Sequence, residues 1–444
     1  MRLQTTTAVL LMQACFTWAI AGAAELGAPV TVAPNVEGTI IQDVPRAAWS
    51  EKANCWLVAW REGDITQEKS EIWCARVSPD GKALDPQGIC VSRAKDLRDR
   101  PSVASDGNDF LVAWGDFRNG KDWDVYAARV SGGGKVLDPD GFLVAGGEHN
   151  QCRPVATFCR GNYAVIFEGF LAGKGPAGAP GTGYVIYSLR VSPDGKPLDQ
   201  PAVPVSDPAV RVQVWEPCAA GGGEGVLVGA YMRGFSGSYP VGVGAGLVAM
   251  PDGKAAAPIA PVKAAGNDYD ALSMPNRGPL PFPAAAWTGK QYLLAIATHG
   301  SEQGVGKTFW LKDAVAVFGV DGKGKEIPGG PSFVVFNRER LNSAPSVSMA
   351  SDGERCLLVE DVVFSKGRTG RTDEELFYQV HGCLLSPDGK PSGDGKPFVI
   401  ADAGKACASG GFASAGPKGQ FLVVWSEARG VDDVKVLARI VKTK

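Results

Sequence analysis

Five carboxylates of this chain could act in pairs on a glycosidic bond. A glycosidase holds its two carboxyl groups about 5–5.5 Å apart in a retaining mechanism and about 6.5–9.5 Å apart in an inverting one. The candidates stand at the ends of expected second strands or in a connection between blades: Glu168, Asp268, Asp270, Glu360 and Asp361. Hydrolysis by such a pair is one hypothesis, and a solvated, charged rim is the other.

A second set of residues could hold a sugar or a peptide without cleaving it. Arg100, Arg153 and Glu216 each stand directly before a proline that opens an expected innermost strand. Aromatic and further charged residues lie in connections expected nearby. The full set predicted to bind is Arg100, Arg153, Trp215, Glu216, Tyr231, Arg233, Tyr269 and His299.

No metal site and no cofactor is predicted. The chain has three histidines and no Cys-x-x-Cys pair, which disfavours a zinc site. The segment 138–141 lacks the remaining oxygen ligands of a calcium loop and is interpreted as a turn. No Gly-x-Ser-x-Gly elbow supports a hydrolase triad. The glycine runs at 221–223 and 244–246 lack the strand–turn–helix context of a nucleotide site.

These candidates are positioned by an internal repeat, whose clearest copy spans residues 101–144. Short β-branched and aromatic runs such as Phe110–Trp114 and Phe421–Trp425 are typical of strands, and Asp-Gly pairs such as Asp106-Gly107 bound them as tight turns. No stretch shows a sustained helical period. Copies start near residues 45, 101, 154, 217, 283, 345 and 411, roughly 53 to 66 residues apart. That spacing is typical of propeller blades and predicts an all-β fold with four strands per copy.

The last copy predicts how the ring closes. It ends at Lys444 after its third strand, and residues 27–33 resemble the missing fourth strand. An N-terminal strand that completes the final blade hides two open sheet edges. We therefore expect one β-propeller domain over residues 24–444 with seven blades. The faint fourth and fifth copies leave six or eight open.

The repeat frame resembles that of a known group. The frame Pro-x-Val-Ala-Ser-Asp-Gly, then Leu-Val-Ala-Trp, then Ala-Arg-Val-Ser-Pro-Asp-Gly-Lys is similar to repeats of uncharacterised secreted bacterial β-propeller proteins. The resemblance covers nearly the whole chain and implies the fold alone. The Ser-Pro-Asp-Gly-Lys turn also resembles that of TolB-like propellers, although it stands at a different place in the repeat. No copy of the sialidase Asp-box, Ser-x-Asp-x-Gly-x-Thr-Trp, is present.

The N-terminus predicts export. A positive start, an apolar stretch from Ala8 to Ile20 and small residues at 21–23 form a secretory signal pattern, with cleavage expected after Ala23. Cys15 follows a poor lipobox, which disfavours a lipoprotein. We expect a secreted or periplasmic monomer without a membrane span. The net charge of −2 and the scattered basic residues disfavour a nucleic-acid partner.

Nine cysteines remain after Cys15, so an odd thiol is left whatever pairs form. Three pairs could form disulfides in an exported protein, and small buried thiols are the alternative. The pairs are Cys55 with Cys74, Cys152 with Cys159, and Cys356 with Cys383.

Residue types that recur in the well-formed copies are interpreted as scaffold, and function is expected on the face with variable loops. The recurrent acids, arginines and tryptophans are Glu62, Asp116, Glu168, Glu427, Arg76, Arg129, Arg190, Arg439, Trp60, Trp114 and Trp425. Loops between the second and third strands, and between blades, vary most in length, and variable loops on a regular scaffold are where binding concentrates. The main hypothesis is an exported module that binds a polysaccharide, peptide or protein. A carbohydrate-active enzyme is the second hypothesis, and a structural surface-layer role is the third.

Overall fold

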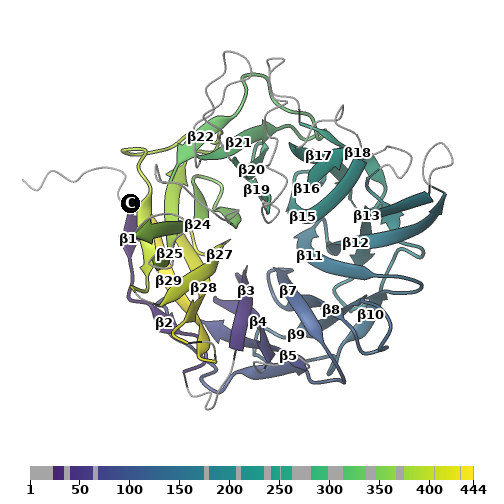
Figure 1. Cartoon of the computed structure of the whole chain (residues 1–444), viewed down its shortest axis with the longest axis horizontal. Helices are drawn as coiled ribbons and strands as arrows, with labels where there is room; N and C mark the ends of the chain where they lie inside the picture. The colour runs from purple at the N-terminus through teal and green to yellow at the C-terminus, as the bar shows by residue number, and fades with distance from the viewer. Residues whose placement is uncertain are drawn as a thin grey trace, which may run out of the picture.

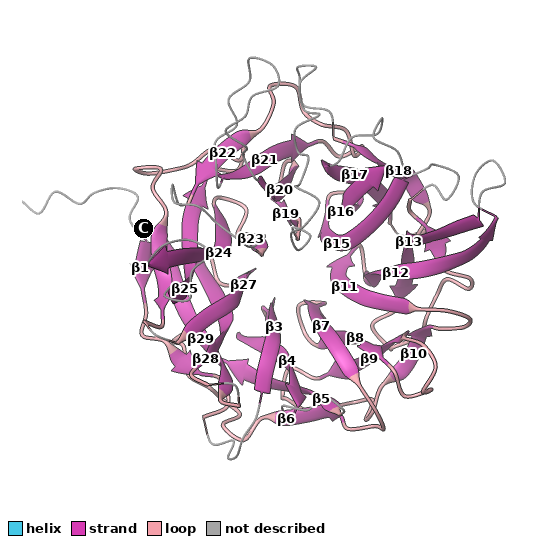
Figure 2. Cartoon of the chain, viewed as in Figure 1, coloured by secondary structure: helices cyan, strands magenta, loops and turns pink. Residues whose placement is uncertain are grey.

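The computed structural model describes residues 24–34, 41–63, 69–174, 180–206, 212–234, 242–250, 252–262, 282–298, 314–336, 346–366, 375–404, 406–430 and 432–443. All regular structure in these ranges is β-strand (Figure 2). Within them, no helix is long and apolar enough to cross a membrane. The signal segment 1–23 lies outside the described residues.

Five blades are separate four-stranded antiparallel sheets arranged around a centre (Figure 1). Blade 2 comprises β7 (Arg98–Ser105), β8 (Phe110–Asp116), β9 (Asp124–Val130) and β10 (Phe142–Ala145). Blade 3 comprises β11 (Gln151–Cys159), β12 (Asn162–Lys174), β13 (Pro180–Val191) and β14 (Val203–Pro204). Blade 4 comprises β15 (Val212–Gly222), β16 (Gly225–Gly234), β17 (Gly242–Ala249) and β18 (Ala255–Pro261). Blade 5 comprises β19 (Ala284–Trp287), β20 (Tyr292–Thr298), β21 (Ala314–Val320) and β22 (Ser332–Val335). Blade 6 comprises β23 (Val347–Ser351), β24 (Cys356–Lys366), β25 (Glu375–Leu385) and β26 (Phe398–Asp402).

The remaining nine-stranded sheet joins the first and last blades. Blade 1 comprises β3 (Ile41–Ser50), β4 (Cys55–Gly63), β5 (Ser70–Val77) and β6 (Ile89–Ser92). Blade 7 comprises β27 (Cys407–Ala415), β28 (Gln420–Ala428) and β29 (Val434–Thr443). Its outer strand comes from the N-terminus, where β1 (Ala24–Leu26) and β2 (Val30–Thr31) pair antiparallel with β29. The seven-bladed propeller and its N-terminal closing strand are therefore confirmed, and Figure 1 shows the purple β1 and β2 beside the yellow β29.

The core lies between neighbouring blades. Leu111 and Ala113 of blade 2 pack in one cluster with Val165 and Phe167 of blade 3, and similar clusters fill the other interfaces. The second strands are buried on both faces, as the uniformly buried β8 shows. This explains why those strands have nearly continuous apolar sequences, because each is covered by a blade on either side.

The recurrent arginine of the third strand forms an ion pair within its own blade and packs against a turn of the next blade. It pairs with an aspartate nine residues later in the same blade, in the pairs Arg76–Asp85, Arg129–Asp138 and Arg190–Asp199, each at 2.8 Å. A glycine in a turn of the next blade packs on each arginine. A Cβ at Gly195, where φ is +85°, would lie 2.9 Å from Nε of Arg129. These arginines are scaffold, as interpreted from sequence; Arg439 differs and donates to the Ile400 carbonyl instead.

The described cysteines form no disulfide bonds. All nine described cysteines are free thiols. Burial raises the pKa of most of them, to about 12 for Cys218 and about 11 for Cys356. Of the two alternatives left open by the sequence, the structure contains the buried thiols.

Candidate functional site

A strained backbone position recurs around the central channel. The pairing of each inner strand with its neighbour shifts register here in five blades. The residue at the shift has a left-handed φ: Val44 (51°), Arg100 (49°), Arg153 (54°), Glu216 (50°) and Gly410 (73°). Residues other than glycine rarely adopt this conformation, and such strain tends to concentrate at functional sites. We call this position the bulge ring.

The same position in blades 5 and 6 is occupied by Phe282 and Ser346. The innermost strand of each blade pairs with the second strand up to the turn that joins them. Phe282 and Ser346 each lie five residues before the last paired residue of the innermost strand, as Arg100 does in blade 2. Phe282 and Ser346 also form an isolated parallel bridge with each other. The bulge ring therefore carries charged side chains in three adjacent blades, 2 to 4, and uncharged side chains in the other four.

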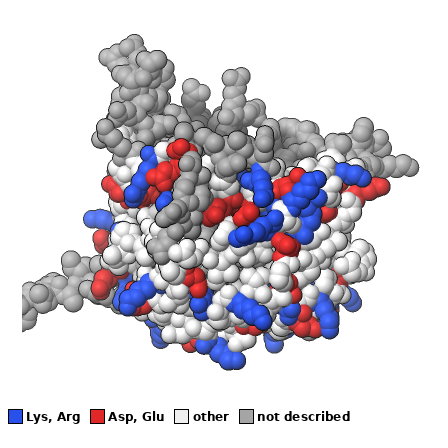
Figure 3. All heavy atoms as spheres, turned by 90° about the horizontal axis from the view of Figure 1, so that it is seen from below, with Lys and Arg blue, Asp and Glu red and all other residues white. Residues whose placement is uncertain are grey.

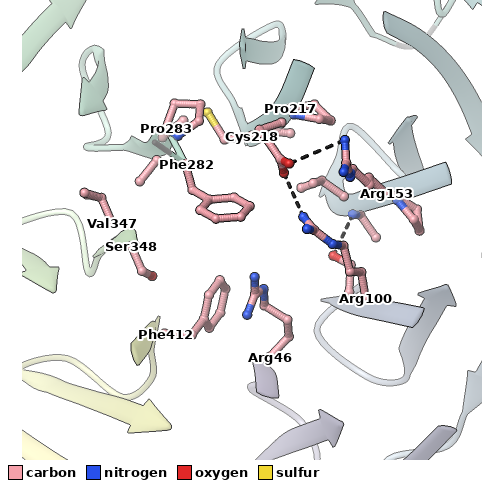
Figure 4. A pocket seen from close by; sticks show the side chains of 18 of the residues that line it. Arg46, Arg100, Arg153, Pro217, Cys218, Phe282, Pro283, Val347, Ser348 and Phe412 are labelled. Carbon is pink, nitrogen blue, oxygen red and sulfur yellow. Dashed lines mark hydrogen bonds and ion pairs between the residues drawn. The ribbon is translucent and has the colours of Figure 1, made fainter. Parts of the chain in front are cut away.

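The charged side chains form one connected group, the polar wall (Figure 4). Arg100 Nη1 lies 2.8 Å from Oε2 of Glu216, and Arg153 Nη1 lies 3.4 Å from Oε1 of the same residue. Arg153 Nη1 is also 3.0 Å from Oε2 of Glu168. Two carboxylates thus share one guanidinium nitrogen. The side chains of Arg100 and Arg153 are about one-third exposed and line the cavity, so both can be reached by a ligand.

Glu168 lies behind this wall and does not line the cavity. Its side chain is fully buried, and Oε1 accepts a hydrogen bond from the backbone nitrogen of Glu216 at 2.7 Å. Burial raises the pKa of Glu168 to about 7 against the opposing attraction of Arg153, and nearby Glu216 raises it further. The group therefore changes charge near neutral pH.

Asp361 occupies the position of Glu168 in blade 6. It accepts hydrogen bonds from the backbone nitrogens of Gly410, at 2.7 Å, and Gly411, at 2.9 Å. Gly410 is the bulge-ring residue of blade 7, as Glu216 is of blade 4. Burial raises the pKa of Asp361. Each carboxylate therefore accepts hydrogen bonds from the backbone at the bulge of the following blade, a contact that we call a clasp. The two carboxylates lie three blades apart.

The other side of the cavity is aromatic and carries a third arginine. The guanidinium of Arg46 lies 5.0 Å from the ring centre of Phe412, and that of Arg100 lies 5.2 Å from the ring of Phe282. Arg46 donates to the Pro45 carbonyl at 2.9 Å. Among the described residues it forms no ion pair within 4.0 Å. Burial and repulsion by Arg100 lower the pKa of Arg46 to about 10.

These walls enclose a cavity of about 200 Å³ in the centre of the ring. Its floor is built from inner-strand residues such as Val103, Val155 and Met349. Glu216 is the single carboxylate among its described lining residues, against three arginines. The cavity therefore favours an anion, because guanidinium groups bind carboxylates with paired, charge-assisted hydrogen bonds. On the described part of the side seen in Figure 3, basic and acidic side chains are interspersed.

The structure brings together only some of the residues predicted from sequence. Arg100, Arg153, Glu216 and Glu168 meet at the polar wall. Trp215 and Tyr231 stack on each other 6.1 Å apart in the core between blades 4 and 5. Glu360 is buried and, as the neighbour of Asp361 along β24, points to the opposite face of that strand.

Four predicted residues, Asp268, Tyr269, Asp270 and His299, lie outside the described residues. The backbone of Arg233 pairs with Gln213, and its side chain is outside the described part.

The sequence analysis grouped Glu168 with the recurrent acids, and this grouping is wrong. In its blade Glu168 occupies the strand position one residue before that of Asp116. Glu168 pairs with Cys152, whereas Asp116 pairs with Arg98, one residue farther from the bulge. Neighbouring strand positions face opposite sides, so Glu168 faces the next blade's bulge and Asp116 does not.

Sequence reasoning missed Arg46, Phe282 and Phe412. Two signals were available: Phe282 precedes Pro283 as Arg100 precedes Pro101, and Arg46 follows Pro45 where other copies have small or apolar residues.

Comparisons with known proteins agree with the fold. No protein-family model and no curated protein matches the chain. A protein of unknown function from Dyadobacter fermentans superposes with a TM-score of 0.51 at 10% identity, over 95% of this chain and 99% of that one. The endosialidase of phage phi92 gives 0.50 at 9% identity, over 96% and 70%. A Trypanosoma rangeli sialidase gives 0.44 at 11% identity, over 90% and 55%. At these identities the likeness shows the propeller fold alone.

Proposed function

We propose that this protein is an exported binding protein that holds a carboxylate-bearing carbohydrate in the central cavity. The observation that carries the proposal is Arg46, a half-buried guanidinium with no ion-pair partner among the described residues. Burial lowers the pKa of Arg46, and repulsion by the neighbouring Arg100 lowers it further. A bound carboxylate would relieve this repulsion, and perturbed groups of this kind concentrate at functional sites.

The remaining lining suits a sugar better than a long acidic peptide. At about 200 Å³ the cavity is smaller than the roughly 300–1,000 Å³ of drug-sized pockets, so it fits one terminal sugar unit. Glu216 can accept hydrogen bonds from hydroxyl groups, and Phe282 and Phe412 offer apolar faces. Export is supported by the signal pattern before Ala24, where the closing strand β1 starts.

Calorimetry with matched ligands tests the proposal. The mature protein is titrated with a uronic-acid oligosaccharide and with the same oligosaccharide after its carboxylates are reduced to hydroxymethyl groups. We expect the acidic form to bind at least tenfold more tightly, and its affinity to fall as salt is added. Equal binding of the two forms, or binding of neither, contradicts the proposal.

Glycoside hydrolysis is the second candidate function. It is favoured by the approach of Glu168 and Glu216 to one nitrogen of Arg153, and by the pKa of Glu168, which suits a general acid near neutral pH. Endosialidases and sialidases among the structural neighbours are compatible with it. However, Glu168 is fully buried and absent from the cavity lining. Release of new reducing ends from the same acidic oligosaccharide would favour this second candidate over simple binding.

A further inference from the structure

We propose that Glu168 is a positioning residue that couples anion binding in the central cavity to uptake of a proton. The inference rests on the proposed function, since it concerns the same site. Glu168 cannot touch a ligand, because its side chain is fully buried behind Arg153 and Glu216. It acts on both of them.

The first step of the argument is geometric. One oxygen of Glu168 accepts the backbone hydrogen of Glu216 at 2.7 Å, which fixes the strained bulge that directs the Glu216 side chain. The other oxygen lies 3.0 Å from Arg153 Nη1, which also reaches Glu216 at 3.4 Å. Arg153 is therefore shared between a buried carboxylate and the cavity.

The second step concerns charge. The charged or titratable groups that face Glu168 are Arg153 and Cys152 on β11, Glu216 on β15 and Arg100 on β7. Cys152 stays protonated near neutral pH, because burial and Glu168 raise the pKa of its thiol to about 12. An anion that binds Arg153 competes with Glu168 for the same positive charge. The loss of that charge stabilises the protonated form of Glu168.

The expected coupling has a definite sign. At pH 6 Glu168 is mostly protonated, Arg153 is free for the ligand, and binding is tight. As the pH rises toward 9, Glu168 ionises and competes with the ligand. If ligand binding raises the pKa of Glu168 by about one unit, affinity falls roughly tenfold over this range and about half a proton is taken up near pH 7.5.

Asp361 provides a matched control. It clasps the bulge of blade 7 with the same kind of hydrogen bonds, yet no arginine side chain donates to it in the described structure. Asp361→Asn therefore weakens an equivalent backbone contact without removing a member of the polar wall. Because Asp361 also attracts Arg46, this control is compared through the pH dependence and the proton uptake, not through the affinity itself. Glu168→Gln keeps the side-chain shape and removes the titration.

The experiment measures affinity for the acidic oligosaccharide from pH 6 to 9. It also measures proton uptake, by calorimetry in buffers of different ionisation enthalpy. We expect the wild type and Asp361→Asn to show the tenfold pH dependence and the proton uptake, and Glu168→Gln to show neither. Binding by the wild type without proton uptake, or uptake that survives in Glu168→Gln, overturns the inference and leaves the proposed function standing.

A ligand-free measurement keeps the inference testable if no acidic sugar binds. Amide hydrogen exchange of Glu216 should speed up by at least tenfold in Glu168→Ala, and Asp361→Asn should leave that exchange unchanged. The Glu168 carboxyl resonance should titrate near pH 7 in the wild type and move to lower pH when chloride is replaced by a non-binding buffer anion. An unchanged Glu216 amide in Glu168→Ala shows that Glu168 positions nothing.

Discussion

The indole Nε1 of Trp114 donates a hydrogen bond to Oδ2 of Asp116 at 2.7 Å, and both side chains are completely buried. The same carboxylate receives Arg118, at 2.6 Å, and lies 3.5 Å from Nε of the buried Arg98. In blade 1, Trp60 donates to Glu62 in the same way at 3.0 Å. A tryptophan followed two residues later by an acid is therefore a structural device that ends the second strand.

Among the acids that follow a second-strand tryptophan, Asp116 and Glu427 should differ sharply in their contribution to the free energy of unfolding. Asp116→Ala leaves Arg98 buried without its carboxylate, and breaking such a buried pair costs about 3–5 kcal/mol. Glu427→Ala removes the matching acid of blade 7, whose partner Arg429 has a 68% exposed side chain, and should cost less than about 1 kcal/mol. Urea unfolding of the two variants measures both values. Equal losses would show that the exposed pair matters as much as the buried one.

Repetition made the scaffold predictable. The Trp–acid hydrogen bond recurs in blades 1 and 2, and the Arg–Asp ion pair recurs in blades 1 to 3, at fixed spacing, because these blades pack against their neighbours in the same way. The closing strand was also predictable, since Val30 and Thr31 supply the strand that the last copy lacks. Arg100, Arg153 and Glu216 stood out because they vary at a fixed position before a proline.

The site as a whole was not predictable to the same extent. Whether an acid faces the bulge of the next blade depends on register, and the bulge shifts register by a residue that no sequence period reveals. Glu168 was consequently placed with the recurrent acids. Arg46 was missed because its significance lies in a neighbour, Arg100, that is distant in sequence and close in space.

Arg46 should contribute to binding at the expense of stability. Arg46→Met removes a half-buried charge that Arg100 repels, so we expect the free energy of unfolding to rise by about 1 kcal/mol. Affinity for the acidic oligosaccharide should fall at least tenfold, since a charge-assisted hydrogen bond contributes about 1.5–3 kcal/mol. Thermal unfolding and calorimetry on one preparation give both numbers. Arg160→Met, at a turn where Arg160 pairs with Glu224, is the control and should leave affinity unchanged. A variant of Arg46 that binds normally would remove the main support for an anion site.

Closure of the ring should depend on Val32. This residue follows β2, is completely buried, and packs against Val58 and Leu422 between blades 1 and 7. Val32→Ala should lower the free energy of unfolding by about 2 kcal/mol through lost burial and a residual cavity. Val399→Ala on the outer strand of blade 6, where Val399 is 41% exposed, should cost less than about 0.5 kcal/mol. Differential scanning calorimetry distinguishes the two. A Val32 variant as stable as the Val399 variant would mean that the N-terminal segment does not stabilise the closed ring.

Glu326 should make the protein less stable as the pH rises from acidic values to neutrality. Neither of its buried side-chain oxygens has a hydrogen-bond partner among the described residues, and burial raises its pKa to about 7. Between about pH 4.5 and 7 the folded state keeps a proton that the unfolded chain has released, so the free energy of unfolding falls across this window and is constant above it.

Glu326→Gln removes this effect and should therefore stabilise the protein at pH 8, by about 1 kcal/mol, while changing little at pH 4. Glu168 contributes a slope of the same sign, so the comparison is made between the variant and the wild type at each pH. Glu354→Gln, whose side chain is 63% exposed, controls for the general effect of removing one negative charge. Urea unfolding at pH 4, 6 and 8 provides the data. If Glu326→Gln and Glu354→Gln gave parallel curves, the buried carboxylate of Glu326 would not be the source of the pH dependence.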